Sequence, residues 1–105
     1  MIGIDIQDLE EFKNSFSNEI QINKILTARE LSIHKTSESR CGVFSVKECL
    51  VKIGIIIPGE WLKVEVLKDE NGKPFITSNL IKNISNIEFS ISHSKETCVA
   101  VAIKL

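Results

Sequence analysis

The hydrophobic pattern changes its period part-way along the chain, and this change limits the folds that the chain can adopt. Between about Ser39 and Ile53, apolar residues recur at the spacing of one helix face. From Leu62 onward, apolar and polar residues alternate, as they do in strands that bury one side. Helices therefore come first and most strands later, which predicts an α+β fold with helices packed on an antiparallel sheet.

The N-terminal segment is expected to form a strand followed by two capped helices. Residues 1–6 are apolar and rich in β-branched side chains, which predicts a buried strand ending near Asp5. Asp8 can cap the helix that follows, whose first turn is acidic. The segment from Thr27 to Glu30 has the form of a capping box, which predicts the start of a second helix.

The second half of the chain predicts antiparallel hairpins. Asn71-Gly72 is a strong turn signal, because this pair tolerates positive φ angles. A short turn after His93 should join the last two strands and leave this histidine at the mouth of their hairpin. The strands expected in this half cover residues 62–66, 73–77, 87–92 and 98–103.

Composition narrows the class of protein. A chain of 105 residues without repeats or a flexible linker predicts one domain over residues 1–105. The net charge of −1 favours neither a nucleic acid nor an anionic membrane as partner. Three cysteines at spacings typical of neither a zinc site nor a disulfide framework fit the reducing cytoplasm. We expect no signal peptide and no membrane-spanning segment.

Lys47 lies inside the apolar face of the longest predicted helix, whereas Glu48 lies at the border of that face. Burial of a lysine is costly unless a charge partner faces it. We expect Lys47 to have no ion-pair partner in the free protein, so Lys47→Met should leave the fold intact or make it more stable. A glutamate at the border is common on amphipathic helices, so the position of Glu48 alone indicates little.

Asp5 is a charge within an apolar strand, and such a charge usually has a partner, binds a metal or caps the next helix. Two carboxylates from distant segments, Asp5 and Glu48, would suit Mg²⁺, which prefers oxygen ligands and is completed by water and substrate phosphate. An ion held there can stabilise the charge that develops when a pyrophosphate is cleaved. With Lys47 beside Glu48, these residues are candidates for phosphate chemistry. His93 is a weaker candidate, because a histidine in a hydroxyl-rich turn is usually bonded to a backbone carbonyl.

Six motifs in a fixed order resemble those of the holo-acyl-carrier-protein synthases, which are 4′-phosphopantetheinyl transferases. Together the motifs span nearly the whole chain. They are Gly3-Ile4-Asp5-Ile6, Ile25-Leu26-Thr27 with Glu30-Leu31, Phe44 to Glu48, Trp61 to Val66, Asp69 to Pro74, and Ile91 to Ser94 with Val99 to Ala102.

The resemblance implies transfer of the 4′-phosphopantetheine arm of coenzyme A to a serine of an acyl carrier protein, with release of adenosine 3′,5′-bisphosphate. It implies that Asp5 and Glu48 bind Mg²⁺. Lys47 would approach the phosphates, and Ser92 and His93 would bind the nucleotide part of coenzyme A. The base that deprotonates the carrier serine is left open between Glu48, acting through water, and His93. Enzymes of this type are typically homotrimers with sites between neighbouring subunits.

Three departures from the family pattern support alternatives. Val43 stands where the family commonly has an arginine, and the glycine-rich loop at residues 54–59 is shortened. The first helix carries Glu10 and Glu11 where arginines usually meet an acidic carrier, which predicts weaker electrostatic steering. A degenerate module that binds coenzyme A or a carrier protein without transfer is therefore the second hypothesis. A purely structural domain, in which Asp5 and Glu48 are unrelated charges, is the third.

Overall fold

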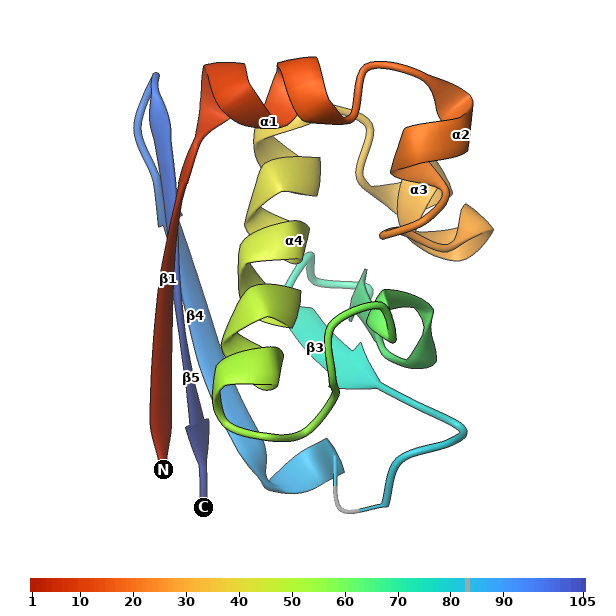
Figure 1. The fold of residues 1–105 in the computed structure, drawn as a ribbon. Helices are drawn as coiled ribbons and strands as arrows, with labels where there is room; N and C mark the ends of the chain where they lie inside the picture. Colours follow the sequence, from red (N-terminus) through yellow and green to blue (C-terminus); the bar gives the residue numbers. More distant parts are fainter. Residues whose placement is uncertain (83) are drawn as a thin grey trace.

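A computed structural model describes residues 1–82 and 84–105, and its main feature is a three-stranded antiparallel sheet covered on one face by a long helix (Figure 1). The strand order is β1 (Ile2–Asp8), β5 (Thr97–Lys104), β4 (Ile87–His93), and the covering helix is α4 (Ser37–Lys52). A second sheet pairs β2 (Glu65–Lys68) with β3 (Pro74–Thr77). The other elements are α1 (Leu9–Ser15), α2 (Glu19–Ile22), α3 (Ala28–Ile33) and the 3-10 helices η1 (Trp61–Lys63) and η2 (Ile84–Asn86). This confirms the predicted α+β class and both hairpins.

Two of the helices, α1 and α3, begin where the capping signals predict. The Asp8 side chain accepts a hydrogen bond from a backbone N–H in the first turn of α1. Thr27 and Glu30 form the predicted capping box of α3, each accepting a bond from the backbone N–H of the other. Thr36 caps α4, which begins two residues earlier than expected, and Gly54 follows its end with a φ of 80°. Among the described residues, no helix is long and apolar enough to cross a bilayer.

One face of β1 packs closely against α4, and Gly3 makes this approach possible. A Cβ atom at Gly3 would lie 2.8 Å from the carbonyl oxygen of Cys49 and 2.9 Å from a methyl group of Ile53. Because alternate residues of a strand share a face, Asp5 and Gln7 point toward the same helix. The glycine therefore brings the Asp5 carboxylate to the side of α4.

The opposite face of β1 is apolar and exposed, so the prediction of a buried strand holds for only one face. The side chains of Ile2, Ile4 and Ile6 are 68%, 61% and 68% exposed. In register with them on β5 are Ile103, Val101 and Val99, respectively. Figure 1 shows that none of the described elements covers this side of the sheet. We call these six residues the outer apolar face.

The strand predicted around Leu62 is shorter than expected, and its first part is a 3-10 turn. The N–H group of Lys63 donates to the carbonyl of Glu60, which closes η1. Leu62 is consequently 48% exposed, whereas Val64 and Val66 are fully buried. The alternation therefore predicted the burial of Val64 and Val66 correctly but was wrong for Leu62, and the backbone becomes a strand only at Glu65.

His34 is buried between α4 and β2 with both ring nitrogens engaged. Its Nε2 lies 2.7 Å from the Val66 carbonyl, which can only accept, so this nitrogen donates. Its Nδ1 lies 2.7 Å from the Ser39 hydroxyl and accepts from it in the neutral ring. Burial is the largest cause that lowers the pKa of His34 below its ordinary value, and the charges of Lys68 and Arg40 add to it. The fold therefore favours the neutral ring.

We expect His34 to make the protein less stable in mild acid. The unfolded chain binds a proton at this histidine first, so the free energy of unfolding should fall as the pH drops below about 6.5. Urea unfolding at about pH 7.5 and about pH 5.5 measures this loss. His34→Gln should make the loss smaller, because this variant has no buried ring to protonate. An unchanged loss in His34→Gln would contradict this explanation.

Candidate active site

Asp5 and Glu48 lie together where β1 meets α4. Asp5 is only 7% exposed, and Glu48 is half-buried. The charge of Asp5 acts on Glu48, and Lys52, one turn further along α4 than Glu48, reaches Asp5. Two acids from distant segments therefore form one cluster, which is evidence against the hypothesis of two unrelated charges.

The electrostatics of this cluster favour a bound cation. Burial raises the pKa of Glu48, the negative charge of Asp5 raises it further, and Lys52 opposes both. A cation between the two carboxylates would relieve their repulsion. Within the described part of the chain, no third acid, histidine or cysteine completes a metal cluster. Two carboxylates suit Mg²⁺, since this ion keeps several waters and takes further ligands from a phosphate.

Lys52 is the site residue that the sequence analysis missed. Its Nζ donates to the carbonyl of Ile4 at 2.7 Å and lies 3.4 Å from Asp5 Oδ1. Its side chain is 50% exposed, so the ammonium group is accessible to a ligand. The signal was present in the sequence, because residues four apart on a helix share a face and Lys52 is four residues after Glu48.

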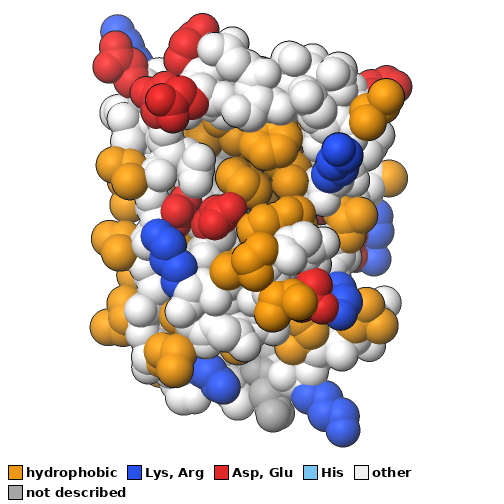
Figure 2. All heavy atoms as spheres, viewed as in Figure 1, with side chains coloured by type: hydrophobic (Ala, Val, Ile, Leu, Met, Phe, Trp, Pro, Cys, Tyr) orange, Lys and Arg blue, Asp and Glu red, His pale blue; other side chains and the backbone are white. Residues whose placement is uncertain are grey.

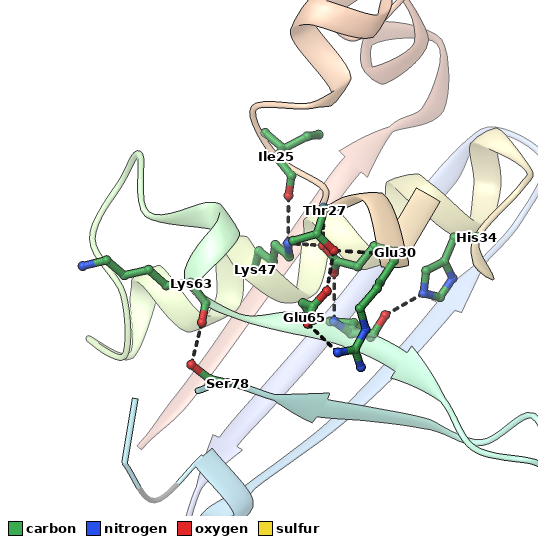
Figure 3. A network of polar contacts seen from close by, with 10 residues as sticks. Ile25, Thr27, Glu30, His34, Lys47, Lys63, Glu65 and Ser78 are labelled. Atoms are coloured by element: carbon green, nitrogen blue, oxygen red, sulfur yellow. Dashed lines mark hydrogen bonds and ion pairs between the residues drawn. The ribbon is translucent and has the colours of Figure 1, made fainter. Parts of the chain in front are cut away.

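Lys47 does not lie at the carboxylate pair, and this corrects the expectation that it approaches the phosphates. Its side chain is fully buried, and its Nζ donates to Glu30 Oε1 at 2.6 Å and to the Ile25 carbonyl at 2.8 Å (Figure 3). Burial lowers the pKa of Lys47, and the charge of Glu30 opposes this change. The ammonium group of Lys47 has no exposed surface with which to contact a ligand, so this residue has a structural role as the partner of Glu30.

Glu30 connects three elements through its carboxylate. Oε1 accepts from Lys47 of α4 and from the Thr27 N–H at the start of α3. Oε2 accepts from the Val66 N–H of β2 at 2.8 Å. The sequence predicted only the capping role of this residue. Its three bonds explain how a fully buried ion pair is tolerated, because both charges are paired and hydrogen-bonded.

His93 lies at a different place, on the far side of α4. It lines a hollow of about 350 Å³ together with Ser39, Val43, Lys68 and other side chains. Ser39 and Glu48 are nine residues apart, which is about two and a half turns of helix, so they project from opposite sides of α4. One copy of the chain therefore does not bring His93 to the carboxylate pair.

Ser92 and His93, both expected to bind the nucleotide, point to opposite faces of the sheet. They are neighbours on β4, and successive strand residues alternate between faces. Ser92 is in register with Val99 of the outer apolar face, whereas His93 is in register with the buried Cys98. Only His93 lines the hollow.

An apolar patch adjoins the carboxylate pair. Phe44 lies one turn before Glu48 on α4 and packs against Phe16 and Trp61, with ring centroids 5.2 Å and 5.6 Å apart. Phe16 and Trp61 are both partly exposed. Figure 2 shows hydrophobic side chains gathered on this face of the molecule, with acidic and basic side chains at the edge of the patch. This patch offers an apolar docking surface beside the acids.

Comparison with known proteins identifies the family of the chain. Residues 1–102 match the family model described as the 4′-phosphopantetheinyl transferase superfamily. The chain belongs to this family. A holo-[acyl-carrier-protein] synthase from Alkaliphilus metalliredigens is 40% identical over 116 residues, covering 97% of this chain and 95% of the relative. One from Nautilia profundicola is 34% identical over 113 residues, covering 100% of this chain and 99% of the relative. The chain is therefore a phosphopantetheinyl transferase of the holo-[acyl-carrier-protein] synthase class.

Solved structures of this class share the fold. The Helicobacter pylori holo-[acyl-carrier-protein] synthase in complex with coenzyme A has a TM-score of 0.80 and 25% identity, and 98% of both chains is covered. The Bacillus anthracis enzyme in complex with CoA (3′,5′-ADP) has a TM-score of 0.77 and 31% identity, covering 96% of this chain and 91% of the other. These likenesses confirm the fold expected from the six motifs.

Proposed function

We propose that residues 1–105 act as one domain that transfers the 4′-phosphopantetheine arm of coenzyme A to a serine of an apo-acyl carrier protein, in a reaction that requires Mg²⁺. The observation that carries this proposal is the meeting of Asp5 and Glu48 at the contact of β1 with α4, with Lys52 beside them. Asp5 and Glu48 would hold the ion, and Lys52 would offer its ammonium group to a phosphate.

In this reaction the serine oxygen forms a bond to the pantetheine-side phosphorus. The bond from that phosphorus to the bridging oxygen breaks, and adenosine 3′,5′-bisphosphate leaves. The bound Mg²⁺ would stabilise the negative charge on the pyrophosphate as this bond breaks. The proton of the serine would pass either to Glu48 through a water molecule or to His93. Lys52, which lies beside Asp5, would add a positive charge for the developing anion.

The complete site would be shared between copies of the chain in a homotrimer. The outer apolar face leaves three isoleucine side chains of β1 exposed, and such a patch is typical of a protein interface. In addition, the carboxylate pair and the hollow that contains His93 and Lys68 lie on opposite sides of α4. A neighbour's hollow could therefore complete the site by binding the nucleotide. The family commonly has an arginine at the position of Val43, and Lys68 in the same hollow would supply the positive charge of that arginine.

We expect Ile2→Glu to shift the assembly toward monomers, because it would bury a charge in the interface. Light scattering after gel filtration would measure the molar mass. Ile20→Glu is the matched control, since Ile20 is 75% exposed on α2, away from the outer apolar face. It should leave the molar mass unchanged. A wild-type monomer, or an Ile2→Glu variant with the same molar mass as the wild type, would contradict the shared site.

The carrier protein would dock beside the carboxylate pair, where the acceptor serine must arrive. The patch of Phe16, Phe44 and Trp61 can take apolar side chains of a carrier. Glu10 and Glu11 on α1 are exposed, so an acidic carrier would gain little electrostatic attraction there. We further propose that the protein works in the cytoplasm, where its three buried, unpaired cysteines would stay reduced.

Mass spectrometry of a carrier protein tests the activity. With coenzyme A and Mg²⁺, an apo-carrier should become heavier by one phosphopantetheine in the presence of this protein, and omission of Mg²⁺ should prevent the change. Calorimetry shows whether coenzyme A binds. Binding of coenzyme A without modification of any of several carriers would instead support the second hypothesis, a binding module. The sequence features that favour this hypothesis are Val43 and the short loop at residues 54–59.

A further inference from the structure

The carboxylate of Asp5 is held by a second side chain of the same strand. Gln7 Nε2 donates a hydrogen bond to Asp5 Oδ2 at 2.8 Å. The two residues are two positions apart on β1, so both point toward α4. On the other oxygen, Oδ1, Asp5 meets Lys52 Nζ at 3.4 Å. The two oxygens of Asp5 therefore have different partners: a neutral amide on one and the ammonium group of the half-exposed Lys52 on the other.

The contact at Oδ2 depends on the chemistry of an amide and not on the volume of the side chain. Gln7 is half-buried, and an apolar residue of similar length could fill the same space. Such a residue could not donate to Asp5, and the nearly buried carboxylate would lose its only neutral donor among the contacts described. A carboxylate that is already oriented loses less freedom when it binds a cation, which is why outer hydrogen bonds tune metal affinity.

We infer that Gln7 is a positioning residue for the metal-binding carboxylate of Asp5. Its amide holds Oδ2 and leaves Oδ1 available to a cation, and the approach of the Lys52 ammonium group to Oδ1 shows that a positive charge can reach this oxygen. This inference rests on the proposed function, in which Asp5 and Glu48 bind Mg²⁺. It assigns to Gln7 a role in metal affinity and none in the transfer step.

Electron paramagnetic resonance of Mn²⁺ tests this role without turnover. Mn²⁺ is titrated into the full chain with coenzyme A present and carrier protein absent. Gln7→Met keeps the length of the side chain but removes the donor, and Gln7→Val is a second variant suited to a strand. Both should bind Mn²⁺ about tenfold more weakly than the wild type. At saturating Mg²⁺ their turnover should stay within about twofold of the wild type, since the loss is one of metal affinity.

The control and the contrary outcomes separate this inference from the proposed function. Gln21→Met removes a glutamine amide on α2 and should leave Mn²⁺ affinity unchanged. If the wild type binds Mn²⁺ and modifies the carrier, but both folded Gln7 variants bind Mn²⁺ as tightly as it does, the role of Gln7 is wrong. If turnover at saturating metal falls while affinity stays constant, the role is also wrong. A wild type that binds no Mn²⁺ and modifies no carrier would overturn the proposed function itself.

Discussion

Asp5→Asn and Glu48→Gln should each reduce the rate of carrier modification by about 10²–10³-fold, the loss found when one preorganised group that stabilises developing charge is removed. Each change keeps the size of the side chain and removes one negative charge from the cluster. The variants should also need more Mg²⁺ for half-maximal rate. The measurement is the initial rate of carrier modification at several Mg²⁺ concentrations.

Stability separates this effect from unfolding. The two carboxylates repel each other, and burial disfavours the charge of Glu48, so Glu48→Gln should leave the protein as stable as the wild type or more so. Glu70→Gln, in the exposed turn before β3, is the control and should change neither rate nor stability. Wild-type rates in both Asp5→Asn and Glu48→Gln at limiting Mg²⁺ would show that these residues are not metal ligands.

Lys47→Met should lower the free energy of unfolding by about 3–5 kcal/mol, the cost of leaving one charge of a buried pair without its partner. This reverses the expectation from the helical pattern, because the structure places Glu30 against Lys47 with neither side chain exposed. Urea unfolding measures the change. Glu30→Gln should also destabilise the protein, and the double variant should lose less than the sum of the single losses, since no buried charge remains.

Lys52→Met is the matched control for this prediction. Lys52 is on the same helix but half-exposed, and its contact with Asp5 should contribute no more than about 1 kcal/mol. Lys52→Met should leave the free energy of unfolding nearly unchanged and slow the transfer. Lys47→Met should lower the free energy of unfolding and leave the transfer rate of the folded fraction unchanged. If Lys47→Met proved as stable as the wild type but lost affinity for coenzyme A, the phosphate role would be restored.

Local signals in the sequence predicted most of the fold. The caps at Asp8 and Thr27 and the turn at Asn71-Gly72 depend on neighbouring residues alone, and all three are confirmed. The segment around Leu62 differs from the predicted strand, because a 3-10 turn and a strand can share one pattern of alternation. The exposed isoleucines of β1 differ for another reason. All three lie on one face of the strand, and a β-branched apolar run is predicted to be buried, but no described element of one chain covers that face.

The site was predictable in part. The order of motifs indicated Asp5 and Glu48, and the structure brings these two acids together. The helical pattern showed that Lys47 needs a charge partner, but it could not name Glu30, because their contact depends on how α3 packs against α4 and β2. Lys52 could have been found from its spacing to Glu48. Gln7 could not, since nothing in a strand pattern distinguishes a donor that holds a carboxylate from a solvated amide.

The most direct test of the central claim is the position of a metal in crystals of the protein with coenzyme A and Mn²⁺. Anomalous scattering from Mn²⁺ locates the ion independently of any activity. The proposed function predicts a single strong peak between the carboxylates of Asp5 and Glu48 in the wild type, and its loss in the Asp5→Asn variant. A peak elsewhere on the chain, or the same peak in Asp5→Asn at full strength, would contradict the assignment of these two acids as the magnesium ligands.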